Sequence, residues 1–242
     1  MARAYNRIAF TQEVRALQAR KGSEAIYAPF LAPETPEDAA LGPAEAAFIT
    51  ARDGFYQATV NAAGWPYVQF RGGAPGFVHI IDERTLAYAD LRGNRQHISA
   101  GNLAQESRVA LFFMDYPNRR RLKMFGWAAA QDAEEAPELR AALAPATARV
   151  ERVVTIRVAG FDWNCPAHIP RRFTLEEIET PLLAQQSRIE ALEAENARLR
   201  RAMGAGGGGG GGRREKPGGG GGGPNPPPPP PPPPPPQKKK TK

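Results

Sequence analysis

The chain has 242 residues, one cysteine and a formal net charge of +7. Residues 213–242 hold seven basic groups and one acidic group, which leaves the first 212 residues with a net charge of only +1. A folded part this close to neutrality argues against a surface that binds duplex nucleic acid. A single cysteine excludes an intrachain disulfide framework, and no apolar run is long enough for a secretion signal or a membrane span. We therefore expect a protein of the cytoplasm.

Two helical patterns come first, and then the hydrophobic period changes from about 3.6 to 2. Thr11 precedes a helix that closes at Gly22, and Pro43 opens a short helix that stops at Asp53 and Gly54. Strands are predicted at 55–61, 65–70, 77–82, 85–91, 108–116, 121–130 and 148–161. Helical patterns at 94–105 and 134–144 interrupt them without regular βαβ alternation. Several strands are apolar on both faces, which favours a barrel covered by helices or by a second subunit.

A helix is predicted after the last strand. Thr174 and Glu177 form a capping-box pattern, and Thr180–Pro181 restarts the helix with proline at its first position. A heptad then runs to Met203, with one core position occupied by Leu182, Ile189, Asn196 and Met203 and the other by Gln185, Leu192 and Leu199. We favour a short coiled coil that reinforces a dimer, in which Asn196 fixes the register. The alternative is a helix lying on its own barrel.

These patterns divide the chain into four parts. Residues 1–42 form a helical or extended segment, 43–173 a barrel domain, 174–203 a helix, and 204–242 a tail. The tail consists of glycine runs, eleven consecutive prolines and basic residues, without a large apolar side chain to bury, so we expect it to be disordered. A polyproline rod could dock on an aromatic groove, but an extension without a partner is the interpretation we favour.

The first candidate site lies on the predicted second strand. Tyr67, Gln69 and Arg71 share one face of this strand, and Gly72 and Gly73 follow, where the backbone can be approached closely. The guanidinium fork of arginine suits a phosphate because it donates two parallel hydrogen bonds. The alternative is an exposed edge strand that ends in a glycine turn.

The second candidate site is the turn that follows the fourth strand. Asp90 ends that strand, Asn94 is a candidate helix cap, and Gln96 follows in the first turn of the helix. Arg92 and Arg95 at a helix N-terminus would oppose the helix dipole, which makes sense if an anion sits between them. The alternative is a solvated basic turn.

Three segments appear in a characteristic order: GWPYVQFRGGAPGF, TLAYADLRGNRQHISAGNL and RVALFFMDYPNRRRLKMFGWA. Over about residues 45–172 the chain resembles the pyridoxamine 5′-phosphate oxidase-related flavin-binding proteins. The resemblance implies a mainly β fold, a six-stranded antiparallel split β-barrel, assembled as a homodimer with FMN at the subunit interface. It gives phosphate roles to Arg71 and Arg95, places Asn94 and Gln96 beside them, and sets Tyr67, Gln69 and Asp90 near the rest of the flavin.

The resemblance also implies that a late tryptophan and basic residues reach the flavin from the partner subunit. The candidates are Trp163, Asn164, His168 and Arg171. Cys165 and His168 have metal-ligand spacing, but two ligands do not make a site, so no metal is expected. We interpret His97 as structural. After Phe173 the chain lacks the basic motif that grips the substrate phosphate in the true oxidases, so the substrate stays open.

The sequence contains no nucleophile elbow, HExxH or phosphate loop, and no catalytic side chain can be assigned. Chemistry carried by a cofactor fits this pattern. We therefore expect an FMN-dependent oxidoreductase that takes hydride from a reduced nicotinamide or another small substrate. The alternatives are a non-catalytic flavin or haem carrier, a deazaflavin-using barrel, and an interaction protein that presents basic polyproline tails.

Overall fold

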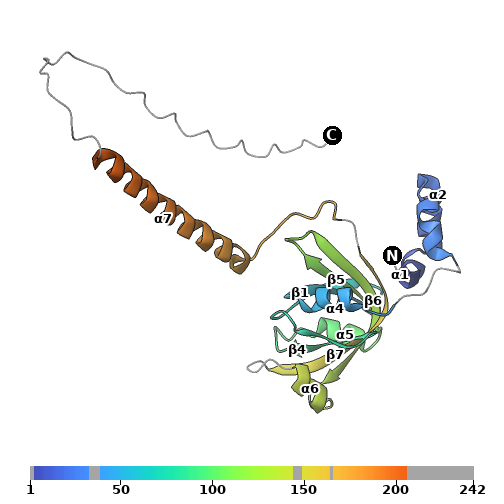
Figure 1. The fold of residues 1–242 in the computed structure, drawn as a ribbon. Helices are drawn as coiled ribbons and strands as arrows, with labels where there is room; N and C mark the ends of the chain where they lie inside the picture. Colours follow the sequence, from blue (N-terminus) through green and yellow to red (C-terminus); the bar gives the residue numbers. More distant parts are fainter. Residues whose placement is uncertain (1–2, 33–38, 144–148, 164–165, 206–242) are drawn as a thin grey trace, which may run out of the picture. The chain divides into compact units, whose positions relative to one another are not determined.

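A computed structural model describes residues 3–32, 39–143, 149–163 and 166–205 (Figure 1). Contacts divide the chain into two units, residues 1–179 and 180–242. Every strand of the described residues belongs to the first unit. The tail predicted for 204–242 lies outside the described residues from 206 onward.

The strands form one antiparallel sheet in the order β2-β1-β5-β6-β7-β4-β3. Their bounds are β1 Gly54–Val60, β2 Pro66–Gly72, β3 Val78–Asp82, β4 Thr85–Leu91, β5 Arg108–Asp115, β6 Arg120–Asp132 and β7 Val150–Trp163. This confirms the predicted mainly β antiparallel fold of the split-barrel type. The sheet has seven strands, where the resemblance implied six.

The sheet curls, so that strands far apart in its order meet through their side chains. Three strands separate β1 from β4 in the sheet, yet the rings of Phe55 and Tyr88 lie 5.5 Å apart. The buried Tyr88 hydroxyl also donates to Oε1 of the buried Gln57 at 2.7 Å. Burial raises the pKa of Tyr88, which keeps this hydroxyl protonated and able to donate. The core is therefore the inside of a barrel, and it contains a hydrogen bond between two buried polar side chains.

The first unit also contains short helices, several of which contact strands of the sheet. They are α1 Arg3–Ala9, α2 Gln12–Lys21, α3 Glu24–Tyr27, α4 Pro43–Thr50, α5 Ile98–Leu103 and α6 Pro137–Leu143, with a 3₁₀ turn, η1, at Ala28–Leu31. The predicted boundaries of α2 hold, because the Thr11 hydroxyl accepts from the Val14 amide and Gly22 ends the helix with φ of 73°. Helix α1 lies on β7 and β6, α5 contacts β1, β2 and β6, and α6 contacts β7 and β4.

Helix α7 runs without interruption over Leu175–Ala205. The predicted capping box is present: the Thr174 amide donates to Glu177, and the Glu177 amide donates to the Thr174 hydroxyl. The predicted restart at Thr180–Pro181 is wrong, because Pro181 lies inside the helix. Proline has no amide hydrogen to donate to the backbone carbonyl of Glu177, four residues earlier. Both residues are exposed, so water can donate to that carbonyl instead. No helix in the described ranges is both long and apolar enough to cross a membrane.

The packing of α1 on β7 depends on Gly160. A Cβ there would lie 2.5 Å from the Tyr5 amide nitrogen and 2.9 Å from the Ala4 carbonyl carbon. We predict that Gly160→Ala lowers the free energy of unfolding by about 1–3 kcal/mol, as overpacking does. Gly101→Ala, at a position where a Cβ meets nothing within 4 Å, is the matched control and should cost nothing. Urea denaturation of both variants measures the difference, and equal midpoints would contradict this packing.

Candidate functional site

Strand β2 directs three polar side chains to the inside of the barrel. Tyr67, Gln69 and Arg71 are half-buried, whereas Val68 and Phe70 between them are 59% and 57% exposed. In the β1 pairing the three polar residues lie opposite Thr59, Gln57 and Phe55, all of which are buried core residues. This is the face that strand alternation predicted, and the register shows that it is the inner one.

Strand β7 contributes a further polar residue, Arg152, which has an aspartate opposite it on each neighbouring strand. Asp90 of β4 and Asp132 of β6 are its register partners, and its guanidinium lies 3.6 Å and 3.5 Å from their carboxylates. The β4–β7 register shifts just after Asp90. Such irregularities re-aim side chains and are common beside functional sites.

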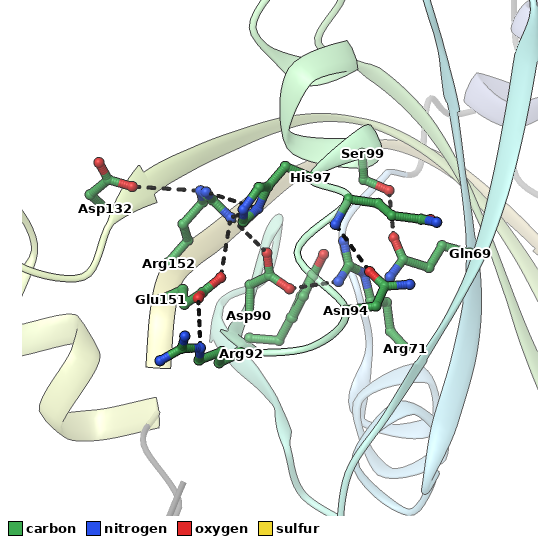
Figure 2. A network of polar contacts seen from close by, with 12 residues as sticks. Gln69, Arg71, Asp90, Arg92, Asn94, His97, Ser99, Asp132, Glu151 and Arg152 are labelled. Carbon is green, nitrogen blue, oxygen red and sulfur yellow. Dashed lines mark hydrogen bonds and ion pairs between the residues drawn. The ribbon is translucent and has the colours of Figure 1, made fainter. Parts of the chain in front are cut away.

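Asp90 bridges two arginines, one on β2 at the end of the sheet and one on β7 beside its own strand (Figure 2). Its carboxylate accepts from Nη1 of Arg71 at 2.6 Å and lies near Arg152 on its other side. The side chains of Arg71 and Asp90 are each 13% exposed, so water screens this ion pair only weakly. Arg71 also lies over the Tyr88 ring, 5.7 Å from its centre. These contacts hold the guanidinium in one position.

The turn between β4 and α5 differs from its prediction. Helix α5 begins at Ile98, four residues after the cap predicted at Asn94. The Asn94 side chain instead accepts from the Gln96 amide at 3.1 Å, an alternative that competes with helix formation. Arg95 and His97 both adopt left-handed backbone conformations, with φ of 61° and 54°. The two arginines predicted at a helix N-terminus therefore lie in a strained loop before it.

His97 closes this loop against β7. Both Nη atoms of Arg152 lie 3.3 Å from Nδ1 of His97. A guanidinium can only donate, so the contact requires a lone pair on that nitrogen. In the next turn the Ser99 hydroxyl donates to Gln69 Oε1 at 2.8 Å and ties α5 to β2. Figure 2 shows these contacts as one network of polar side chains.

Residues of this network line a cavity of about 190 Å³, which we call the mouth cavity. Of the residues predicted from the sequence, seven line it: Tyr67, Gln69, Arg71, Asp90, Asn94, Arg95 and Gln96. Residues missed by sequence reasoning also line it, namely His97, Ser99, Glu151 and Arg152. Three arginines and two carboxylates give the lining one excess positive charge.

The other predicted site residues lie elsewhere. Arg92 points to Glu151, with 3.8 Å between the charged atoms, and Gly72 and Gly73 follow Arg71 without lining the cavity. Trp163 donates to Glu45 at 2.7 Å and stacks with Arg120 beside a second cavity. His168 and Arg171 are exposed, and Asn164 lies outside the described residues. Within one chain, the late segment is not part of the mouth cavity.

A sequence model of the pyridoxamine 5′-phosphate oxidase family matches residues 41–164. The match covers the barrel and every residue of the mouth cavity. The chain belongs to this family. A search of curated proteins found no match.

Solved structures give more distant likenesses to this family member. A putative pyridoxamine 5′-phosphate oxidase from Lactobacillus delbrueckii is 21% identical with a TM-score of 0.42, over 52% of this chain and 95% of that one. An FMN-binding protein from Syntrophomonas wolfei is 12% identical with a TM-score of 0.38, over 50% and 83%. HutZ, a haem storage protein from Vibrio cholerae, is 16% identical with a TM-score of 0.34, over 51% and 94%. Likenesses at this level do not determine a ligand.

The donors of this family member's mouth cavity fit an anion. Nε of Arg71 is buried and has no hydrogen-bond partner among the described residues. An unsatisfied buried donor costs about 1–3 kcal/mol, so a ligand that accepts from it is stabilised. Across the described residues, no group of three or more histidine, cysteine, aspartate or glutamate side chains could hold a metal ion. The site thus offers cationic donors in a partly buried position.

The role of Asp90 can be tested in this family member by Asp90→Asn. The substitution removes the counter-ion shared by Arg71 and Arg152, and we predict a loss of about 1–3 kcal/mol in the free energy of unfolding. Inorganic phosphate should restore stability more in this variant than in the wild type, because the lining becomes more positive. Glu83→Gln, which removes an exposed pairing with Arg84, is the control and should change little. Thermal denaturation with and without phosphate is the measurement; an equal phosphate effect in all three proteins would refute the account.

Proposed function

We propose that this protein binds FMN with the phosphate in the mouth cavity, and that it is an FMN-dependent oxidoreductase. The main support for this proposal is Nε of Arg71, a buried donor without a hydrogen-bond partner among the described residues. Its position beside Arg95, in a lining with one excess positive charge, supports a doubly charged phosphate over a neutral ligand. Arg71 is fixed by Asp90, so little side-chain freedom is lost when an anion binds.

The size of the cavity supports binding of only one part of FMN inside it. Pockets that enclose a whole small-molecule ligand measure about 300–1,000 Å³, and the mouth cavity has about 190 Å³. It suits the phosphate end of the molecule. The ring system would then lie outside the mouth cavity. A second surface is needed to cover it.

A second copy of the chain can provide that surface. Tyr56, Val68 and Phe70 are exposed on the outer face of β1 and β2, and the rings of Tyr56 and Phe70 pack edge to face at 5.4 Å. An exposed apolar patch of this kind is typical of a protein–protein interface. We infer a homodimer through this face, with the late segment around Trp163, His168 and Arg171 approaching the flavin of the partner.

Several residues of the mouth cavity have their own roles in this proposal. Asp90 and Arg152 orient Arg71, Arg71 and Arg95 hold the phosphate, and Ser99 fixes Gln69 through its carbonyl oxygen, which leaves the amide nitrogen of Gln69 to donate. Bound flavin would accept and release hydride at its ring. The substrate is proposed only as a class, a reduced nicotinamide or another small hydride donor.

The absorption spectrum of the purified protein is the first experiment. Flavin bands, with FMN released on denaturation, are the expected result, and turnover with reduced nicotinamide would then establish the oxidoreductase. A haem spectrum, or stabilisation by a deazaflavin and not by FMN, would replace FMN with the corresponding alternative. A colourless protein that is not stabilised by FMN at ~100 times its expected dissociation constant, where binding adds about 2.7 kcal/mol, would refute flavin binding.

The position of the phosphate can be tested by comparing two arginines. Arg71→Ala should weaken FMN binding at least about tenfold, because a charge-assisted hydrogen bond contributes on the order of 1.5–3 kcal/mol. Arg119→Ala, beside the second cavity, should have little effect, and Arg71→Lys should be intermediate because lysine keeps the charge without the fork. Flavin fluorescence quenching measures all three dissociation constants. A larger effect at Arg119 would move the phosphate to the second cavity.

The barrel dimer can be tested in a chain that ends at Thr180. We predict that this shortened chain remains a dimer, and that Val68→Arg in it produces monomers that bind FMN weakly, since the substitution buries a charge in the apolar face. Ile26→Arg, at a position 63% exposed on α3, is the matched control and should stay dimeric. Light scattering measures the mass. A shortened chain that is monomeric before any substitution would show that the barrel face does not join the chains.

A further inference from the structure

Helix α7 presents one apolar seam along its whole length. Counting in sevens from Leu175 gives two core positions, one with Leu175, Leu182, Ile189, Asn196 and Met203 and the other with Ile178, Gln185, Leu192 and Leu199. The seven apolar members of these positions are all exposed, from 39% at Ile178 to 81% at Met203. Helices in proteins gain most of their stability by packing such a face against a partner. The seam therefore lacks a partner within this chain's described residues.

We propose that α7 pairs in parallel and in register with α7 of a second copy, as a two-stranded coiled coil. The helix has 31 residues, enough for four heptads, and its seam keeps the period of 3.5 that wraps two helices around each other. Ile189 is a β-branched residue at the first core position, and Leu192 and Leu199 fill the second. This combination favours two strands over three or four.

The charges beside the seam complement each other in this pairing. In a parallel pair, the residue before the first core position faces the residue five further along the other helix. Arg188 then faces Glu193 of the second copy, and Glu195 faces Arg200. Each match occurs twice by symmetry, and none of these pairs brings like charges together. Charge complementarity of this kind sets partner choice and orientation.

The two polar residues of the seam distinguish the orientations. In the parallel register Asn196 meets Asn196 of the second copy, where the two amides can satisfy each other. A competing antiparallel register sets Asn196 against Gln185 and brings Arg188 to Glu195. The parallel arrangement is the one in which a single asparagine specifies both partner and register.

This pairing is independent of the flavin proposal. The seam lies beyond residues 41–164, which match the oxidase family, and its partner would be the same whether or not the barrel binds FMN. It also gives the barrel dimer a second connection. The two connections differ in their residues, so each can be broken without the other.

Cysteine cross-linking in the full-length chain tests the proposal. In a Cys165→Ser background, Leu199→Cys should form a disulfide-linked dimer under mild oxidation. The reason is that position 199 of one copy faces position 199 of the other in the seam. Ala194→Cys, on the opposite side of the helix, is the matched control and should cross-link only at the rate of random collision. In the antiparallel register two copies of position 199 lie about 25 Å apart along the axis, at about 1.5 Å per residue.

Charge reversal gives the second arm. Arg188→Glu in the Leu199→Cys protein should slow cross-linking several-fold, and adding Glu193→Arg should restore it. Restoration by Glu195→Arg instead, or cross-linking only in a mixture of Leu182→Cys and Leu199→Cys proteins, would overturn the parallel arrangement. Cross-linking of Leu199→Cys no faster than that of Ala194→Cys would overturn the pairing of α7 altogether.

Discussion

The ion pair between Arg71 and Asp90 joins the two ends of the curled sheet. Arg71 lies on β2 at one end, and Asp90 lies on β4, one strand from the other end, with β1, β5, β6 and β7 between them in the sheet order. The hydrogen bond from Tyr88 to Gln57 joins β4 to β1, the strand next to β2. The mouth cavity exists because these contacts hold β2 against β4. A change that opened the barrel would therefore remove the site as well.

The same pair sets the electrostatics of the site. Asp90 is shared by Arg71 and Arg152, and Arg152 is further held by Asp132, Glu151 and His97. A buried charge cluster must be compensated, or it costs more than it contributes. Here the compensation is incomplete, since Nε of Arg71 has no hydrogen-bond partner among the residues that the structure describes. The backbone of Arg95 is also held in a left-handed conformation. Unsatisfied donors and strained backbone gather at sites that a ligand completes.

The sequence predicts the parts of this account that depend on local pattern. Alternation along β2 identifies the face of Tyr67, Gln69 and Arg71, and the capping pattern at Thr174 identifies the start of α7. The sequence predicts a helix start at Asn94 because its side chain can cap a helix, but the same side chain can form a local turn instead. Only the backbone of the folded chain distinguishes the two.

The missed residues depend on contacts between distant segments. Arg152 joins the site because the register of β7 sets it between Asp90, 62 residues earlier, and Asp132. The sequence alone favours a structural role for His97, which in the folded chain contacts Arg152 and lines the mouth cavity. The hydrophobic pattern within a single strand does not determine the register in which it pairs with its neighbours. The signal that identifies Arg152 is a charged residue that lies opposite residues of the other charge on both neighbouring strands.

A comparison of FMN with riboflavin tests the central claim most directly, because the two ligands differ only in the phosphate. Titration calorimetry on the wild-type protein and on Arg71→Ala provides both affinities under one set of conditions. The account predicts that riboflavin binds the wild type at least about tenfold more weakly than FMN, and that this difference largely disappears in Arg71→Ala. Equal affinities for the two ligands in the wild-type protein would contradict a phosphate site at Arg71.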